Sequence, residues 1–259
     1  MELWKVIVIG IVEGITEWLP ISSTWHLLLL DAWMPLPMSE HFKEMFFVVV
    51  QLGAILAVVT EYWHRLLPRS NPWRLWGRIL IGCLPAGVLG LLLDDLLEAY
   101  FGTPLTIAAM LILYGVLFII VERRHPDPIV NEIEARPLST AVAIGFFQAL
   151  AMIPGTSRSG ATILGGLLLG VSRTAAAEFS FFLALPTMVG ASALKLIKFG
   201  LDFTPNEIMT LVPGMTTAFL VSMASIRFLM TYIRTHDFKV FGWYRIGLGI
   251  LVLLNIWQY

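Results

Sequence analysis

Long apolar stretches that recur along the chain constrain its fold more than any other feature. Six of them approach the roughly 20 residues that cross a bilayer as a helix. They lie at residues 45–63, 79–93, 105–122, 176–198, 209–226 and 241–258. Only 14% of the residues are charged, whereas about 25% of a soluble domain is charged. The sequence therefore predicts an all-α integral membrane protein, built as a single membrane domain over residues 1–259.

Two further apolar regions, 4–30 and 139–170, are each interrupted by a turn-forming segment. The first break is PISST at residues 20–24, and the second is PGTSRSG at residues 154–160. Irregular backbone persists at membrane depth only where protein or a water-filled cavity satisfies its amides. We therefore expect each region to form a re-entrant helical hairpin, which enters and leaves the membrane on the same side.

The charges of the loops predict how the chain threads the membrane, because short loops rich in Lys and Arg stay in the cytoplasm. Basic residues gather in the segments 64–78, 123–138 and 227–240, which we place inside. The segments 94–104 and 199–208 carry acidic residues and no Lys or Arg, so we place them outside. Both termini then lie outside, the first hairpin enters from outside and the second from inside.

An internal repeat accounts for this arrangement. Pro20 and Pro154 are 154 − 20 = 134 residues apart, and three further pairs share that offset: Ser23 with Ser157, Glu44 with Glu178, and Phe47 with Phe181. Repeat one covers about residues 1–122 and repeat two about residues 139–259. Each repeat would hold one hairpin and three crossings, an odd number, so the second must be inserted upside down. The sequence thus predicts an inverted-topology repeat.

The first hairpin carries two acidic residues at helical spacing. Glu13 and Glu17 are four residues apart, which places both carboxylates on one helical face, and residues 10–19 contain no Lys or Arg. Burying two unpaired anions side by side is costly, so a cation or a shared proton must accompany them. We expect a divalent cation with oxygen ligands, Mg²⁺ or Ca²⁺. The alternative is a surface helix whose polar stripe meets water.

Hydroxyl groups and an imidazole follow in the first break, at Ser22, Ser23, Thr24 and His26. Ser and Thr are common helix N-caps, and capping alone could account for one or two of them. A lone His on an apolar face is usually a core residue. Because two carboxylates precede His26, we interpret it, with Ser23, as a candidate nucleophile or general acid/base.

The second break has the features of a phosphate site. Amides at a helix start, hydroxyl donors and the guanidinium of Arg158 together make a cradle for phosphate oxygens. The expected contacts are Thr24, Ser157, Arg158, Ser159, Gly160 and Thr162. The alternative is that Arg158 pairs with Glu13, Glu17 or Glu178, as intramembrane charges often do. Ser22, Gln148 and Glu178 are candidates for lining the same cavity, although Glu178 could equally cap a helix.

Composition excludes several other classes of protein. A net charge of −1 lacks the clustered Lys and Arg of a nucleic-acid-binding surface. The single cysteine, Cys83, rules out an internal disulfide and a multi-cysteine metal site. Glu13 and Glu17 interrupt what would be the apolar region of a signal peptide, so we take residues 1–12 as mature protein.

These motifs resemble the undecaprenyl-diphosphate phosphatases linked to bacitracin resistance. The resemblance covers nearly the whole chain and lies in ExxxE from Glu13, PxSSTxH from Pro20, PGxSRSGxT from Pro154 and EFSF from Glu178. One departure is Trp25, at a position where the family usually has Gly. The resemblance implies hydrolysis of the C55 isoprenyl diphosphate to the monophosphate, dependence on a divalent cation, and a role in recycling the lipid carrier of peptidoglycan synthesis.

The resemblance also implies a place and a set of residues. It indicates the bacterial cytoplasmic membrane, with an active site that opens to the outer face, and it makes Glu13, Glu17, Ser23, His26 and Arg158 the catalytic candidates. The partners would be a long-chain isoprenyl diphosphate and the membrane, with no nucleic acid; a homodimer is compatible with the sequence. The alternative function is a membrane transporter or lipid flippase, since inverted repeats with broken helices are common in transporters. A nucleophile and base beside a carboxylate pair favours the phosphatase.

Overall fold

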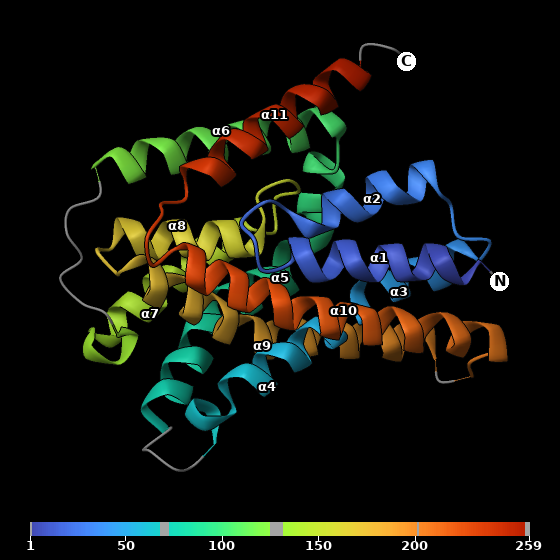
Figure 1. Ribbon diagram of the computed structural model, residues 1–259, viewed down its shortest axis with the longest axis horizontal. Helices are drawn as coiled ribbons and strands as arrows, with labels where there is room; N and C mark the ends of the chain where they lie inside the picture. The colour runs from blue at the N-terminus through green and yellow to red at the C-terminus, as the bar shows by residue number, and fades with distance from the viewer. Residues whose placement is uncertain (1, 68–72, 125–131, 201, 257–259) are drawn as a thin grey trace.

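Figure 1 shows the computed structural model, which describes residues 2–67, 73–124, 132–200 and 202–256. Helices dominate these residues, as the sequence predicts. The first half contains α1 (Leu3–Thr16), α2 (Ser23–Trp33), α3 (Glu40–Val49), α4 (Gln51–Leu66), α5 (Trp73–Phe101) and α6 (Pro104–Arg124). After a short 3₁₀ turn at Ile133–Ala135, the second half contains α7 (Leu138–Leu150), α8 (Arg158–Leu168), α9 (Arg173–Phe199), α10 (Pro205–Tyr232) and α11 (Lys239–Ile256).

Five of the predicted crossings coincide with helices that are long and apolar enough to span a bilayer. These are Glu40–Leu66, Trp73–Leu93, Pro104–Arg124, Arg173–Phe199 and Pro205–Tyr232. The sixth prediction, residues 241–258, falls on α11, which the structure describes as far as Ile256. The all-helical membrane class is confirmed, whereas the number of crossings stays a prediction.

Both interrupted regions fold as two short helices joined by irregular backbone. The first region is α1 followed by α2, with a gap between Thr16 and Ser23, and the second is α7 followed by α8, with a gap between Leu150 and Arg158. The two breaks face each other near the middle of the molecule (Figure 1), where the Ser159 hydroxyl donates to the Leu19 carbonyl at 3.1 Å. Entry and exit on one membrane side stays a prediction.

The offset of 134 residues also relates helix boundaries. Adding 134 to the bounds of α1 gives 137–150, against 138–150 for α7, and adding it to 40–66 gives 174–200, against 173–199 for α9. The contacts follow the same rule, because α1 packs on α10 whereas its counterpart α7 packs on α5, the counterpart of α10. A two-fold relation between the halves requires this exchange of partners.

Glycines bring the paired helices close together. A Cβ at Gly10 would lie 2.7 Å from the Gly214 carbonyl oxygen, so α1 meets the backbone of α10 directly. Gly115 and Gly242 play the same part between α6 and α11, where either Cβ would meet the other's carbonyl oxygen. Small residues at such crossings are characteristic of helix packing in membranes.

The ends of the helices sort by the charge of their connections. In Figure 1 the ends of α4, α6 and α10, which precede the basic segments, lie toward the left. The start of α1 and the end of α11 lie toward the right, as do the end of α9 and the start of α10. The helix ends that precede the basic segments therefore lie at one end of the molecule, and the start of α1 and the end of α11 lie at the other.

Candidate active site

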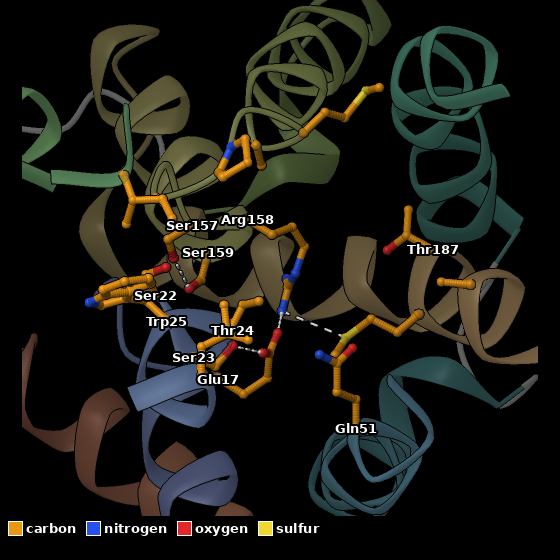
Figure 2. A pocket seen from close by; sticks show the side chains of 18 residues that line it. Glu17, Ser22, Ser23, Thr24, Trp25, Gln51, Ser157, Arg158, Ser159 and Thr187 are labelled. Carbon is orange, nitrogen blue, oxygen red and sulfur yellow. Dashed lines mark hydrogen bonds and ion pairs between the residues drawn. The ribbon is translucent and has the colours of Figure 1, made fainter. Parts of the chain in front are cut away.

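A cavity of about 390 Å³ lies between the two hairpins. Both breaks supply its polar lining: Ser22, Ser23 and Thr24 from the first, and Ser157, Arg158 and Ser159 from the second. In Figure 2, Arg158 approaches Glu17 and Ser23 from the opposite side, and Ser22, Ser157 and Ser159 lie together at the left. The helices α2 and α8 begin at the cavity, so the positive ends of their dipoles make it suitable for an anion.

Glu17 joins the two breaks through its carboxylate (Figure 2). The Ser23 hydroxyl donates to Glu17 Oε2 at 2.5 Å, and Arg158 Nη2 donates to Glu17 Oε1 at 2.7 Å. Glu17 is only 6% exposed, and Arg158 also donates to the Ser180 carbonyl at 2.7 Å. Of the pairings weighed for Arg158, the structure contains the one with Glu17, and Arg158 still lines the cavity.

Strained backbone precedes each cluster of polar side chains. Ser22 has φ 75° and Ser157 has φ 71°, and each is the N-cap of the helix that follows. A non-glycine residue in this region is disfavoured and persists only where its surroundings enforce it. The strain turns the chain abruptly, so that Ser23 and Arg158 begin their helices at the cavity.

Glu13 is the most deeply buried acidic group of the site. It is 0% exposed, and neither carboxylate oxygen has a hydrogen-bond partner among the described residues. Glu17 and Arg158 lie near enough to act on it electrostatically. An unpartnered carboxylate beside a second carboxylate offers the oxygen ligands that Mg²⁺ and Ca²⁺ prefer. Glu13 does not line the cavity, both Glu17 oxygens already accept from Ser23 and Arg158, and the described residues contain no group of three or more His, Cys, Asp or Glu side chains that could hold a metal, so the divalent cation stays a prediction.

His26 does not line the cavity. Its Nδ1 lies 2.7 Å from the Ser22 carbonyl oxygen and its Nε2 lies 2.7 Å from the Tyr244 hydroxyl. A carbonyl only accepts, so Nδ1 carries the proton and donates, and Nε2 accepts from Tyr244. With both ring nitrogens occupied, His26 is placed to support the first break rather than to attack a substrate.

Four other predicted residues lie behind the cavity wall. The Thr162 hydroxyl donates to the Ser180 hydroxyl at 2.7 Å and is fully buried. Gly160 N–H donates to the Ser157 hydroxyl at 3.2 Å, which closes the start of α8. Glu178 pairs with Arg65, and Gln148 is 3% exposed. None of the four lines the cavity in this conformation: Gln148, Gly160 and Thr162 belong to the second hairpin, and Glu178 belongs to α9.

The structure adds residues that the sequence interpretation did not single out. Gln51 of α4 and Thr187 of α9 line the cavity, and no local motif marks either residue. Trp25 also lines it from inside α2, so the side chain that replaces the family's usual Gly is accommodated in the helix. Arg245 is fully buried in α11. The rule that charges at membrane depth have a function would have flagged it.

The chain is similar to known proteins over nearly its whole length. The family model described as bacitracin resistance protein BacA matches residues 6–251. A protein of Enterococcus faecalis named undecaprenyl-diphosphatase is 58% identical, over 98% of this chain and 97% of the relative. Proteins with the same name from Desulfitobacterium hafniense and Lachnoclostridium phytofermentans are 57% and 54% identical, over 98% and 97% of this chain and 96% of each relative.

Proposed function

Because this chain belongs to the bacitracin resistance protein BacA family, we propose that the cavity between its hairpins is where it hydrolyses undecaprenyl diphosphate. The chain is a hydrolase that releases phosphate from this lipid and leaves the monophosphate. The contact that carries the assignment of the site is the Glu17 carboxylate, which accepts from Ser23 and from Arg158. The Ser23 hydroxyl, the Glu17 carboxylate that can act as its base, and the Arg158 guanidinium that can bind phosphate thereby meet at one cavity.

We propose Ser23 as the nucleophile. Its Oγ would attack the terminal phosphorus, its proton would pass to Glu17, and the bond to the bridging oxygen would break, so that the lipid monophosphate leaves. Water would then attack the phosphorylated Ser23 and release inorganic phosphate. The hydrogen bond to Glu17 at 2.5 Å supports this choice, because a nucleophile must lie within reach of its base.

Arg158 and the two helix starts supply the electrostatic part of the mechanism. Charge that builds on the transferring phosphoryl group would be offset by the guanidinium and by the N-terminal dipoles of α2 and α8. Ser157, Ser159 and Thr24 line the same space, although the Ser159 hydroxyl already donates to the Leu19 carbonyl.

Glu13 and Glu17 would hold a divalent cation, Mg²⁺ or Ca²⁺, and Glu17 would exchange one of its contacts with Ser23 and Arg158 for it. Its chemistry would be to neutralise phosphate oxygens as a Lewis acid. The buried, unpartnered oxygens of Glu13 support the assignment, since such a carboxylate is costly without a compensating positive charge.

The lipid tail has an apolar exit from the cavity. A groove of about 390 Å³ runs between α5 and α7, lined by Leu89, Leu93, Leu97, Phe146 and Leu150 among others. Met152 lines both this groove and the cavity, so the two spaces adjoin. We assign the groove to the isoprene units next to the diphosphate.

The orientation that we propose places both termini and the mouth of the site on the outer face of the cytoplasmic membrane. The separation of the basic helix ends from the termini supports it. The competing function, a transporter or flippase, receives no support from the names of the relatives. Transport also does not require a hydroxyl bonded to a carboxylate at the centre of the site.

The test is phosphate release by the purified protein from undecaprenyl diphosphate. We expect release with Mg²⁺ or Ca²⁺, loss of release with a chelator, and recovery when the cation is restored. Acid quenching during turnover should trap phosphoserine at Ser23, detectable by mass spectrometry, and Ser23→Ala should abolish both signals. Turnover without a phosphorylated Ser23, and retained in Ser23→Ala, would show that water attacks directly.

A further inference from the structure

Arg245 is a charge at membrane depth with an unusual set of partners. It is 0% exposed, and among the described residues no carboxylate pairs with it. Its guanidinium instead donates to three backbone carbonyls. Nη1 donates to Pro20 at 3.1 Å, and Nη2 donates to Gly155 and to Thr156, both at 2.8 Å. One side chain of α11 therefore holds the first break and the second break together.

These carbonyls belong to residues one or two positions before the strained serines of the site. Thr156 precedes Ser157, and Pro20 lies two residues before Ser22; both serines have positive φ. Strained backbone needs its surroundings to hold it in place, and hydrogen bonds from a buried guanidinium are among the strongest that a neutral carbonyl can accept. Arg245 fixes the carbonyl side of each turn from which Ser23 and Arg158 emerge.

The preceding residue of α11 holds the first break at a second point. The Tyr244 hydroxyl donates to His26 Nε2, and His26 Nδ1–H donates to the Ser22 carbonyl, each at 2.7 Å. These two hydrogen bonds thus connect Tyr244 to Ser22, the strained residue of the first break. Adjacent residues of one helix thus hold both turns, although neither lines the cavity.

We propose that Tyr244 and Arg245 are positioning residues for the reaction, which set Ser23 and Arg158 in register through the two turns. The inference rests on the proposed function, because it assigns a role within the same site. Arginine suits the position since its planar fork can serve carbonyls from two segments at once, whereas a lysine ammonium is a single point charge. The Tyr114 ring supports the guanidinium, whose Cζ lies 5.5 Å from the ring centroid.

The experiment compares Arg245→Lys, Arg245→Met and Tyr244→Phe with the wild-type enzyme, all purified in detergent with Mg²⁺. We expect Arg245→Lys to fold and to lose about 100-fold in kcat, as reacting groups misplaced by roughly 1 Å do. KM should change little, because the groups that contact the substrate are still present. Tyr244→Phe should lose up to about tenfold in kcat, for one hydrogen bond. Arg245→Met should lose more than Arg245→Lys.

Arg173→Lys is the matched control. Arg173 is also an arginine held by hydrogen bonds, but its partner is the Glu122 carboxylate and it does not line the cavity. We expect this variant to lose some thermal stability and to keep the wild-type kcat. If Arg245→Met fails to fold, Arg245→Lys and Tyr244→Phe decide the question.

The outcomes separate this inference from the assignment of function. A wild-type protein that releases no phosphate overturns the proposed function and the inference with it. An active wild type whose Arg245→Lys variant keeps its kcat overturns the inference alone. So does a loss confined to KM, which would make Arg245 a determinant of substrate binding, or an equal loss of kcat in Arg173→Lys, which would point to general destabilisation.

Discussion

At the scale of single residues, Glu17 is the member of the site with two distinct duties. One oxygen accepts from the Ser23 hydroxyl and the other from Arg158, so this carboxylate positions both the nucleophile and the phosphate cradle. Glu13, one helical turn earlier, has its oxygens free of hydrogen-bond partners among the described residues. The two carboxylates therefore differ in role, although their spacing in the sequence makes them look equivalent.

Replacing Glu17 with Gln tests the first of these roles. An amide offers one good acceptor where two donors need one each, so Ser23 loses its base and Arg158 loses its counter-charge. We expect kcat to fall by about 10² to 10⁴-fold, the usual worth of a positioned acid or base, while the thermal transition shows a folded protein. Glu44→Gln is the control, since the pair that Glu44 makes with Lys195 at 3.7 Å is exposed and lies outside the cavity lining. Wild-type phosphate release from Glu17→Gln would refute the assignment.

Gly155 permits a second prediction at this scale, now about stability. Its φ is +91°, and a Cβ there would lie 2.6 Å from the Ile107 carbonyl oxygen. Gly155→Ala should therefore destabilise the fold by about 1–3 kcal/mol from backbone strain alone, measured as a lower thermal midpoint in detergent. Gly190 lies inside α9 with open space around it, so Gly190→Ala should stabilise by about 0.5–1 kcal/mol. Equal effects at the two sites would argue against a tight turn at Gly155.

At the scale of elements, the four short helices of the hairpins create the site and the long helices enclose it. The interruptions bring two helix N-termini to one cavity, which continuous spanning helices would not do. The long helix α5 and the short helix α7 then form an apolar groove beside the cavity. The polar cavity suits the charged diphosphate of the substrate, and the apolar groove suits its isoprene tail.

The groove makes a prediction that depends on chain length. Leu93→Trp should fill part of it and raise KM for undecaprenyl diphosphate, while methyl diphosphate, which has no isoprene units, should be affected far less. Leu91→Trp on the same helix is the control, because Leu91 is 82% exposed and does not line the groove. Steady-state kinetics with both substrates measures the difference. The same change in KM for the two substrates, or the same change in both variants, would count against a tail site.

At the scale of the whole molecule, the two halves are related by an exchange of partners. The pairs α1 with α10 and α7 with α5 correspond to each other, and α6 packs on its own counterpart, α11. If the halves are inserted in opposite orientations, each hairpin reaches the middle of the bilayer from its own side, and neither alone could build the site.

Cysteine labelling of intact cells tests that orientation. On a Cys83→Ala background, Asp202→Cys should react with a membrane-impermeant maleimide, because the acidic segment is predicted outside. Thr235→Cys, in a basic segment, should react only after the membrane is permeabilised; both positions are exposed. Labelling of Thr235→Cys in intact cells with protection of Asp202→Cys would reverse the proposed topology.

Local properties of the chain were sufficient to predict much of this protein. Apolar stretches long enough to cross a bilayer predict membrane helices, so the helical membrane class and the two interrupted regions could be recognised from the sequence directly. The offset of 134 residues, found in the sequence, also relates the observed bounds of α1 to those of α7, and 40–66 to α9, to within one residue. Glu17, Ser23 and Arg158 could be chosen because charges and hydroxyl runs are costly at membrane depth unless they have a function.

Relations between distant segments were decided by the tertiary structure alone. The sequence made Ser23 and His26 equal candidates for the nucleophile. In the structure Ser23 bonds to Glu17, whereas His26 bonds to Tyr244, which is 218 residues away in the chain. The sequence left three glutamates as possible partners of Arg158, and in the structure it pairs with Glu17 because the two breaks lie against each other. Arg245 reaches Pro20 across 225 residues. Helix periodicity reports only which neighbours a residue has along its own segment, whereas the partner of a buried polar group depends on which segments pack against it.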